Sequence, residues 1–433
     1  MINRILLAIC AAAFLIAASA ANCDDSESQS TTFLRMVHES RELFRTGRFH
    51  PALFKSQEAL SLAEAAFTKN SWQYVRATSE FSTILKATKL SPVDQAALEE
   101  VLEGMGRQHR QIRGGNAEVA EKAGPDLLEK CDKLLGTNSC LSDLELDLLC
   151  QALNATGKGK EERKVLLWRL KRLESNRMSD DPDLIVCRML LAVNSSLSPE
   201  EIWSAASHFN LCIKECRKHP EDSKVFGFVS LACAMFLNEM NAPERSLEYT
   251  EKGRKLLGTE LSEQQRIEVG RICAIALAHM GKGSQAHAEL AAIEPLVKGN
   301  GVAVRAVQEL VRTEVYLASD NIPKATSAFA EYKDLTKEMS TSPRRMWSIA
   351  LEGELAVKHS DFRKAEEILG ELTREWQSSD APGRDHPRNL RPLKLLSQVK
   401  KNIGKSAEAD GLNLRIAKLT TKMREAVETA IAP

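Results

Sequence analysis

The feature that most constrains the fold is a small residue that recurs at a nearly fixed interval through the second half of the chain. Each occurrence lies five positions after a turn of small or polar residues. The recurring residues are Ser246, Ala286, Ala325, Ala365 and Ala409, which are separated by steps of 40, 39, 40 and 44 residues. A period this steady indicates an internal repeat of helical hairpins. Since one hairpin cannot bury its apolar surface alone, we expect the hairpins to stack into a solenoid.

The apolar pattern assigns different environments to the two helices of a repeat. Residues 302–317 carry two apolar stripes, which is typical of an interior helix. The first consists of Val304, Val307, Val311 and Val315, and the second of Ala303, Ala306, Leu310 and Leu317. The following helix is apolar on one side, with Ile322, Ala325, Phe329 and Tyr332 inward and Lys324, Glu331, Lys333 and Asp334 outward. No stretch alternates long enough to predict a strand, so the fold class is all-α.

Helix starts are marked by capping sequences. Ser142 with Glu145 and Ser262 with Gln265 fit the capping box, in which two side chains bond reciprocally to backbone N–H groups. A polar residue followed by proline marks other starts, at Ser91-Pro92, Asp181-Pro182, Ser198-Pro199 and Ser342-Pro343. These signals divide the chain into many helices of ordinary length.

Within this frame the sequence resembles the tetratricopeptide repeat. Thr46-Gly47-Arg48-Phe49 followed by Ala52 and Ala59-Leu60 is similar to the middle of that repeat, as are Met280-Gly281 with Ala286 and Phe362 with Ala365. Small residues also stand at the family's first-helix position, at Ala234, Ala274, Gly353 and Ser397. The resemblance implies a right-handed superhelical solenoid of antiparallel hairpins. The period near 40 differs from the family's 34, and the usual proline is missing. Longer repeats of the HEAT type are therefore the alternative.

The expected organisation has four parts. We expect a signal peptide over residues 1–21, a flexible segment over 22–31, N-terminal helical repeats over 32–112 and the tetratricopeptide-like solenoid over 113–433. Glycines cluster at Gly104, Gly106, Gly114 and Gly115, and Gly124 precedes Pro125. This composition predicts a hinge or subdomain boundary at about 104–125.

The first residues predict export. Arg4 precedes an apolar run from Ile5 to Ala18, and small residues allow cleavage near Ala20 or Ala21. The run is short for a membrane anchor, and no later stretch is long enough to span a bilayer. Cys23 would accept a lipid in a bacterial lipoprotein, but Asn22 stands where such signals carry a small residue. We therefore expect a chain in the bacterial periplasm or cell envelope, with a cleaved signal as the favoured alternative.

Charge and cysteine usage exclude several classes. The chain carries 59 basic and 59 acidic residues, which argues against a dedicated nucleic-acid binder. Loss of Cys10 with the signal leaves an odd number of cysteines, most of which lie on apolar helix faces, where we expect buried free thiols. Cys212 and Cys216 lack the spacing and partners of a zinc site. The residues 158–173 form a basic amphipathic helix, which is either a repeat helix with a solvated face or a contact for anionic lipid or another polyanion.

No catalytic motif, metal ligand set or cofactor signature is present in the sequence. Gly404-Lys405-Ser406 lacks the upstream glycine of a phosphate-binding loop, and the histidines form no paired ligand motif. The favoured function is a non-enzymatic scaffold that binds a protein or peptide in a concave groove. The alternatives are an enzyme or ligand-binding protein whose site is assembled from distant residues, and a structural component of an envelope complex.

The resemblance also implies where a partner binds, because first-helix residues line the groove of tetratricopeptide repeats. The corresponding residues here are Arg271, Ile275, His279, Leu310, Glu314, Trp347, Glu354, Lys358, Lys394, Gln398 and Lys401. Trp347 is either a binding residue or a filler of the interface between hairpins. The longest step contains a proline-rich loop from Asp380 to Pro392, and long loops on a regular array often carry function.

Overall fold

The computed structural model describes residues 29–197, 201–218, 223–337, 339, 345–375 and 386–432, and within them it contains helices and no strand. The expected signal peptide, Cys23, Ser198-Pro199 and Ser342-Pro343 lie outside these residues. The chain divides into two compact units, which comprise residues 6–194 with 211–226 and residues 195–210 with 227–433. We call them the N-terminal and the C-terminal unit.

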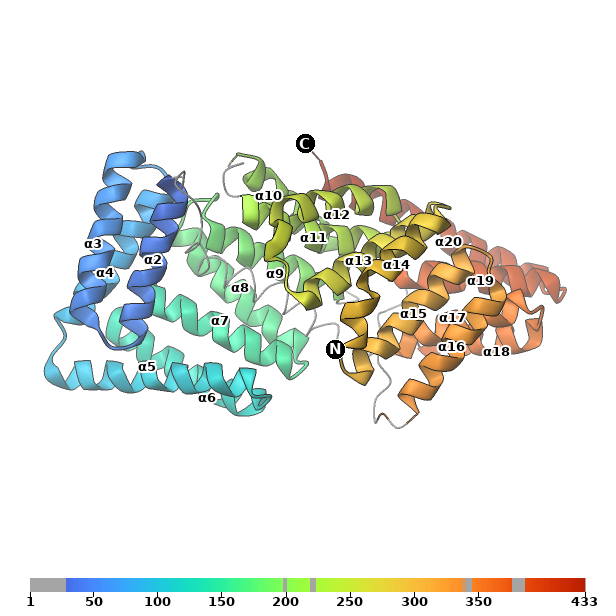
Figure 1. Cartoon of the computed structure of the whole chain (residues 1–433), viewed down its shortest axis with the longest axis horizontal. Coiled ribbons are helices and arrows are strands. Elements are labelled where there is room, and N and C mark those ends of the chain that lie inside the picture. Colours follow the sequence, from blue (N-terminus) through green and yellow to red (C-terminus); the bar gives the residue numbers. More distant parts are fainter. Residues whose placement is uncertain are drawn as a thin grey trace. The chain divides into compact units, whose positions relative to one another are not determined.

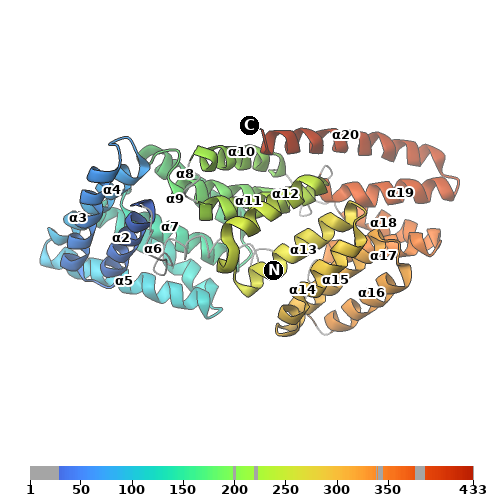
Figure 2. The ribbon, with the colours of Figure 1, turned by 45° about the horizontal axis from the view of Figure 1, so that its top comes forward.

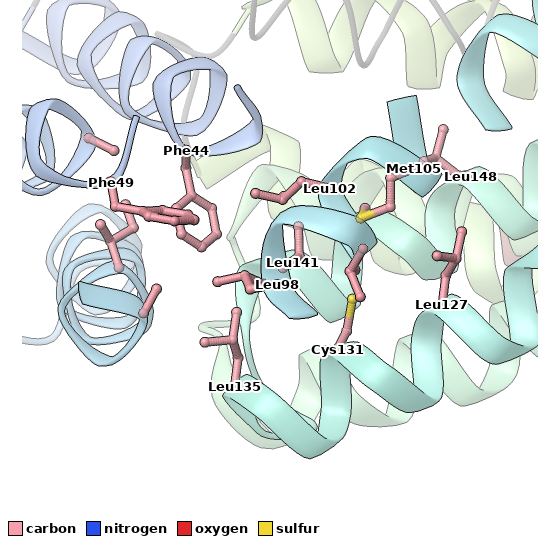
Figure 3. Close-up of a cluster of buried hydrophobic side chains, with 14 residues drawn as sticks. Phe44, Phe49, Leu98, Leu102, Met105, Leu127, Cys131, Leu135, Leu141 and Leu148 are labelled. Atoms are coloured by element: carbon pink, nitrogen blue, oxygen red, sulfur yellow. The ribbon is translucent and has the colours of Figure 1, made fainter. Parts of the chain in front are cut away.

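The N-terminal unit is built from helical hairpins that follow one another along the chain (Figure 1). Its helices are α2 (Gln29–Arg45), α3 (Phe49–Ala66), α4 (Trp72–Thr88), α5 (Pro92–Arg113), α6 (Ala117–Leu135), α7 (Cys140–Ala155), α8 (Gly159–Asn176) and most of α9 (Pro182–Leu197). A core cluster joins the first three hairpins: Phe44, Phe49, Leu98, Cys131 and Leu141 point toward one another from α2, α3, α5, α6 and α7 (Figure 3). Neighbouring hairpins therefore bury one continuous apolar interior.

The C-terminal unit repeats the same architecture. Two helices have residues in both units, α10 (Ile202–Lys218) and α11 (Ser223–Glu239). The C-terminal unit continues with α12 (Pro243–Leu257), α13 (Glu263–His279), α14 (Gly283–Lys298), α15 (Val302–Ala318), α16 (Ile322–Thr336), α17 (Arg345–Lys358), α18 (Phe362–Glu375), α19 (Leu390–Asn402) and α20 (Ser406–Ala430). Two 3-10 turns, Gly258–Glu260 and Pro387–Asn389, interrupt the series. The long α20 pairs with α19, and the Asn210 amide of α10 donates to the Ala432 carbonyl at 3.0 Å (Figure 2).

The predicted repeat register is confirmed. Ser246, Ala286, Ala325, Ala365 and Ala409 are all fully buried. The residue five positions before each has a positive φ, between 53° and 80°, at Asn241, Gly281, Asp320, Ser360 and Gly404. This left-handed conformation ends the first helix of each hairpin and starts the second. The same arrangement occurs in the N-terminal unit, where Gly47, Gly115 and Gly157 precede the buried Ala52, Ala120 and Glu162. The same repeat register therefore also holds in the N-terminal unit, where the sequence predicted helical repeats from the match at Gly47 and Ala52.

The two apolar patterns are confirmed as well. On α15 Val307, Val311 and Val315 are at most 2% exposed, and so are Ala306, Leu310 and Leu317 of the second stripe. On α16 the predicted inward residues are buried or half-buried, while the four predicted outward residues are exposed. First helices thus pack on two sides and second helices on one.

The glycine cluster at 104–125 is not a boundary between the units, which divide near residues 195–226. Gly104 lies inside α5, and a Cβ there would approach Leu127 Cδ2 to 2.6 Å. Gly124 lies inside α6, where a Cβ would meet Leu149 at 2.8 Å. These glycines permit close helix packing, which composition alone does not distinguish from flexibility. Gly114 and Gly115 form an ordinary hairpin turn. Residues 29–31, expected to be flexible, belong to α2.

Most of the predicted caps in the described residues are present. Ser262 and Gln265 form a capping box at the start of α13, and Ser91 accepts from the Asp94 N–H at 3.1 Å. The expected box of Ser142 with Glu145 is wrong: Ser139 caps α7, and the Glu145 side chain is fully buried within the packed hairpins. Glu145 faces inward because it lies six residues past the cap, beyond the first turn.

Candidate functional site

A connected polar network lies along the first helices of consecutive hairpins in the C-terminal unit. Its centre is Glu314 on α15, whose side chain is 9% exposed. Glu314 Oε1 contacts His279 Nε2 of α13 at 2.9 Å, and Glu314 Oε2 accepts a hydrogen bond from Trp347 Nε1 of α17 at 2.6 Å. Side chains from three stacked helices therefore meet on one carboxylate.

Arg391 extends this network to a fourth helix. At the start of α19, its Nη1 donates to Glu314 Oε1 at 2.7 Å, and its Nη2 lies 2.6 Å from Glu354 Oε2 of α17. One guanidinium thus bridges two carboxylates, a geometry that arginine's planar fork allows. We call Glu314 with His279, Trp347, Glu354 and Arg391 the Glu314 network.

The electrostatics of the network hold Glu314 in its charged form. Burial by itself raises the pKa of this carboxyl, but the Arg391 charge and the hydrogen bonds from His279 and Trp347 outweigh it and lower the pKa to about 2. His279 and Arg391 keep 27% and 30% of their side chains exposed. The network therefore presents fixed charges and donors at an accessible surface.

Trp347 combines a packing role with this polar contact. It is half-buried and packs against two core clusters, one formed by α13, α14 and α15 and the other by α15, α16 and α17. Its ring therefore fills space between stacked hairpins, while its Nε1 points to Glu314. Removal of the ring is expected to lower stability, because the packing contacts of both clusters are lost together.

Two of the predicted site residues lie in the interior. Leu310 is fully buried in the core cluster of α15 to α17. Arg271 is 2% exposed, and its guanidinium donates to Gln308 Oε1 at 2.9 Å, to Glu268 Oε1 at 2.5 Å and to the Val304 carbonyl at 2.7 Å. The bonds to Gln308 and Val304 join α13 to α15, and the bond to Glu268 lies within α13, so this side chain holds the two helices together.

The remaining predicted residues are more accessible. Ile275 is half-buried, and Lys394, Gln398 and Lys401 are exposed on α19. Lys358 is exposed and pairs with Asp320 of the neighbouring turn at 2.6 Å. No described contact joins these five residues to the Glu314 network. The structure thus brings His279, Glu314, Trp347 and Glu354 together and leaves the lysines at separate positions.

Arg391 was not among the predicted site residues, although its loop was. Pro382-Gly383 lies outside the described residues, but the end of the loop is described and anchored. Arg388 donates to both carboxylate oxygens of Glu239 on α11 at 2.7 Å, and His386 is buried. The sequence signal for these contacts was the insertion that lengthens the last repeat step from about 40 to 44 residues. It places two arginines against acidic residues that are 149 and 77 positions away.

Other charge clusters are internal in the N-terminal unit and partly exposed in the C-terminal unit, where Lys400 and Lys405 share Glu366. In the N-terminal unit Arg76 contacts Asp181 at 3.0 Å and Arg41 contacts Glu80 at 2.9 Å, with Arg76 and Glu80 at most 2% exposed. No group of three potential ligands there or elsewhere in the described chain is arranged to hold a metal ion. Nor does any described helix have the length and apolar character needed to cross a membrane.

The eight cysteines in the described residues are buried and form no disulfide. Burial raises the pKa of Cys187 and Cys273 to about 12. The expectation of buried free thiols is confirmed for this part of the chain.

Comparisons with known proteins identify the fold. No family model and no curated protein sequence matches the chain. Among solved structures, the Rap protein complexed with Competence and Sporulation Factor has a TM-score of 0.54 and 12% identity over 76% of this chain and 99% of that chain. A Rap conjugation gene regulator of the plasmid pLS20 in complex with the Phr* peptide has a TM-score of 0.44 and 11% identity, covering 92% and 97%. Yeast Tom70 has a TM-score of 0.34 and 12% identity, covering 93% and 96%. The fold is a tetratricopeptide-like stack of helical hairpins.

Proposed function

We propose that this tetratricopeptide-like chain is an exported, non-enzymatic scaffold that binds a protein or peptide along the first-helix face of its C-terminal unit. The observation that carries the proposal is the Glu314 network, in which four helices hold donors and acceptors in a fixed arrangement at an accessible surface. Binding to a preformed arrangement avoids much of the entropy cost of ordering side chains.

The repeat register supports a binding face longer than the network itself. Ile275, Glu314, Glu354 and Gln398 occupy one position of the repeat, because they follow one another by the same steps as the buried small residues. Side chains at one position of stacked helices form a row along the array. A row that mixes an apolar side chain, two carboxylates and an amide suits an extended chain, which offers both backbone groups and side chains.

The solved Rap structure adds a precedent for this use of the fold. That protein is complexed with Competence and Sporulation Factor, and this chain covers 99% of its length. A protein of similar fold therefore forms a complex with a factor. We extend the same class of activity to this chain, in the exported compartment that residues 1–21 predict.

The test is affinity capture with the full mature chain as bait, compared between wild type and variants. Lys358→Glu combined with Lys401→Glu reverses two exposed charges on first helices. Lys255→Glu combined with Lys418→Glu reverses two exposed charges on second helices of the same unit and is the matched control. The proposal is supported if wild type and the control bind the same partner with equal affinity and the first-helix variant binds it at least about tenfold more weakly.

Trp347 needs a paired comparison because it also packs between hairpins. Trp347→Phe preserves most of the ring and removes the Nε1 donor, whereas Trp347→Ala removes both. We expect affinity per folded molecule to fall for both variants, and thermal stability to fall mainly for Trp347→Ala. Unchanged affinity per folded molecule in both would place Trp347 in the core alone. Turnover of a small molecule by the purified chain would instead favour an enzyme.

A further inference from the structure

The outward face of α8 in the N-terminal unit carries apolar side chains that the core does not use. Leu166, Leu170 and Leu173 face inward and are at most 8% exposed, within a cluster shared with Cys150, Leu184 and other residues of the neighbouring helices. Leu167 lies beside this buried face and Trp168 lies nearly opposite it, and each is 44% exposed. The helix therefore has a buried face that explains its folding and a second apolar feature that folding does not require.

Three lysines occupy the surface between these two apolar side chains. At about 100° per residue, Lys160, Lys164 and Lys171 fall inside the roughly 100° of helix surface that separates Leu167 from Trp168. All three are exposed, and no described acidic side chain pairs with them. Glu161 and Glu174 border this surface, and Glu174 is paired with Arg188 at 3.1 Å. We call Lys160, Lys164, Leu167, Trp168 and Lys171 the α8 stripe.

The basic residues that the sequence grouped together divide into two sets in the structure. Arg169 is fully buried and bonds to Asp143 and Asp147, both at 2.8 Å, so it belongs to the interior. Arg172 bonds to Asp132, and its guanidinium lies 4.2 Å from the Trp168 ring centroid. This stacking fixes the orientation of Trp168 at the surface. The lysines of the stripe have no comparable internal role.

From this arrangement we infer that the α8 stripe docks the N-terminal unit on the surface of an anionic lipid bilayer. Unpaired lysines are attracted to anionic headgroups, and a tryptophan suits the headgroup level because its ring is apolar with one polar atom. Protein hot spots typically lie in well-packed, desolvated pockets, whereas Leu167 and Trp168 are each 44% exposed and have lysines between them. The inference is independent of partner binding at the Glu314 network, because it concerns a different unit and a different ligand.

The experiment is co-sedimentation of the full mature chain with vesicles of phosphatidylglycerol mixed with phosphatidylcholine, and with vesicles of phosphatidylcholine alone. We expect binding to the anionic vesicles, no binding to the neutral ones, and loss of binding at high salt because surface charges are screened. Lys160→Glu combined with Lys171→Glu should lower the partition coefficient at least about tenfold.

The chain offers a matched control for this variant on a neighbouring helix. Lys122 and Lys133 on α6 are exposed and are also eleven positions apart, so Lys122→Glu with Lys133→Glu makes the same charge change on a face that also carries exposed Glu118, Asp126 and Glu129. This control should bind like wild type. Leu167→Ala should weaken binding, and Phe54→Ala, at another exposed apolar residue of the unit, should not.

Each other outcome overturns the inference. Equal binding to neutral vesicles would mean that lipid charge is not recognised, and equal losses in the α6 and α8 variants would mean that net charge, not the stripe, governs binding. Absence of vesicle binding together with salt-sensitive binding of soluble polyglutamate would assign the stripe to an acidic protein. Unfolding temperatures of all variants, measured in parallel, identify any loss that arises from the fold.

Discussion

The buried Glu145 carboxyl makes the stability of the N-terminal unit depend on pH. The side chain is fully buried between α5, α6 and α7, and neither oxygen has a hydrogen-bond partner of normal geometry in the described chain. Burial raises its pKa to about 8, and the nearby Gln108 amide offsets only part of this effect. The Cys131 thiol faces the same interior, and its pKa is raised by burial and by the Glu145 charge. The folded chain therefore holds a proton on Glu145 that the unfolded chain releases near pH 4.5.

The sign of the effect follows from the proton count. Between about pH 4.5 and pH 8 the folded state binds more protons than the unfolded state, so the free energy of unfolding falls as pH rises. One pKa unit corresponds to about 1.4 kcal/mol, and the full difference between the two states is therefore on the order of 5 kcal/mol. The stabilising contribution is present below the unfolded pKa and is lost as pH approaches about 8.

Glu145→Gln isolates this contribution, because glutamine has nearly the same shape and does not titrate. Urea unfolding at several pH values from 5 to 8, followed by far-UV circular dichroism, should show a flatter pH dependence for the variant than for wild type. The variant should be more stable than wild type at pH 8 by about 1–3 kcal/mol. Glu129→Gln, at an exposed position of α6, is the control and should leave the pH dependence unchanged. An unchanged slope in Glu145→Gln, or a variant less stable than wild type at pH 8, would refute the reasoning.

Two further predictions concern packing and thiols. Ala286→Trp and Ala325→Trp place a large ring at fully buried positions between paired helices. Each should lower the free energy of unfolding, measured in urea, by at least ~1–3 kcal/mol. If both variants unfold like wild type, the repeat register is wrong. The eight buried cysteines should resist a thiol reagent in native protein and react in urea, as counted by mass spectrometry; rapid labelling of native protein would contradict their burial.

The repeat register was predictable from sequence because it reflects a steric requirement. Where two helices approach most closely, a large side chain does not fit, so Ala286, Ala325 and Ala365 recur at the same phase. The turn before each needs a positive φ, which restricts the residue type at Gly281, Asp320 and their equivalents. Both requirements act on residues that are close in sequence, and therefore they appear as a pattern in one sequence.

Features that depend on distant partners were not predictable in the same way. Arg391 contacts Glu314, which lies 77 positions earlier, and no local sequence pattern predicts that pair. Glu145 matched a capping sequence, but the preceding Ser139 took the cap, so the same carboxyl became a buried group with a raised pKa. Gly104 and Gly124 matched the composition of a hinge because a glycine-rich sequence does not show what packs against each glycine. In the structure a leucine side chain, from Leu127 and Leu149 respectively, fills the space next to it.

The candidate site contains both accessible and interior residues because each first helix packs on two sides. A first helix packs against its own partner and against the next hairpin, so only a narrow strip of its surface remains accessible. Arg271, Leu310 and the buried Glu314 fall on the packed sides, whereas His279 reaches the strip and contacts Glu314. Trp347 lies at the border and contributes to both. Because Arg391 joins carboxylates on α15 and α17, the proposal implies that a partner which competes for Glu314 would also change the contact of Arg391 with Glu354, and we therefore expect binding at one hairpin to be coupled to its neighbour.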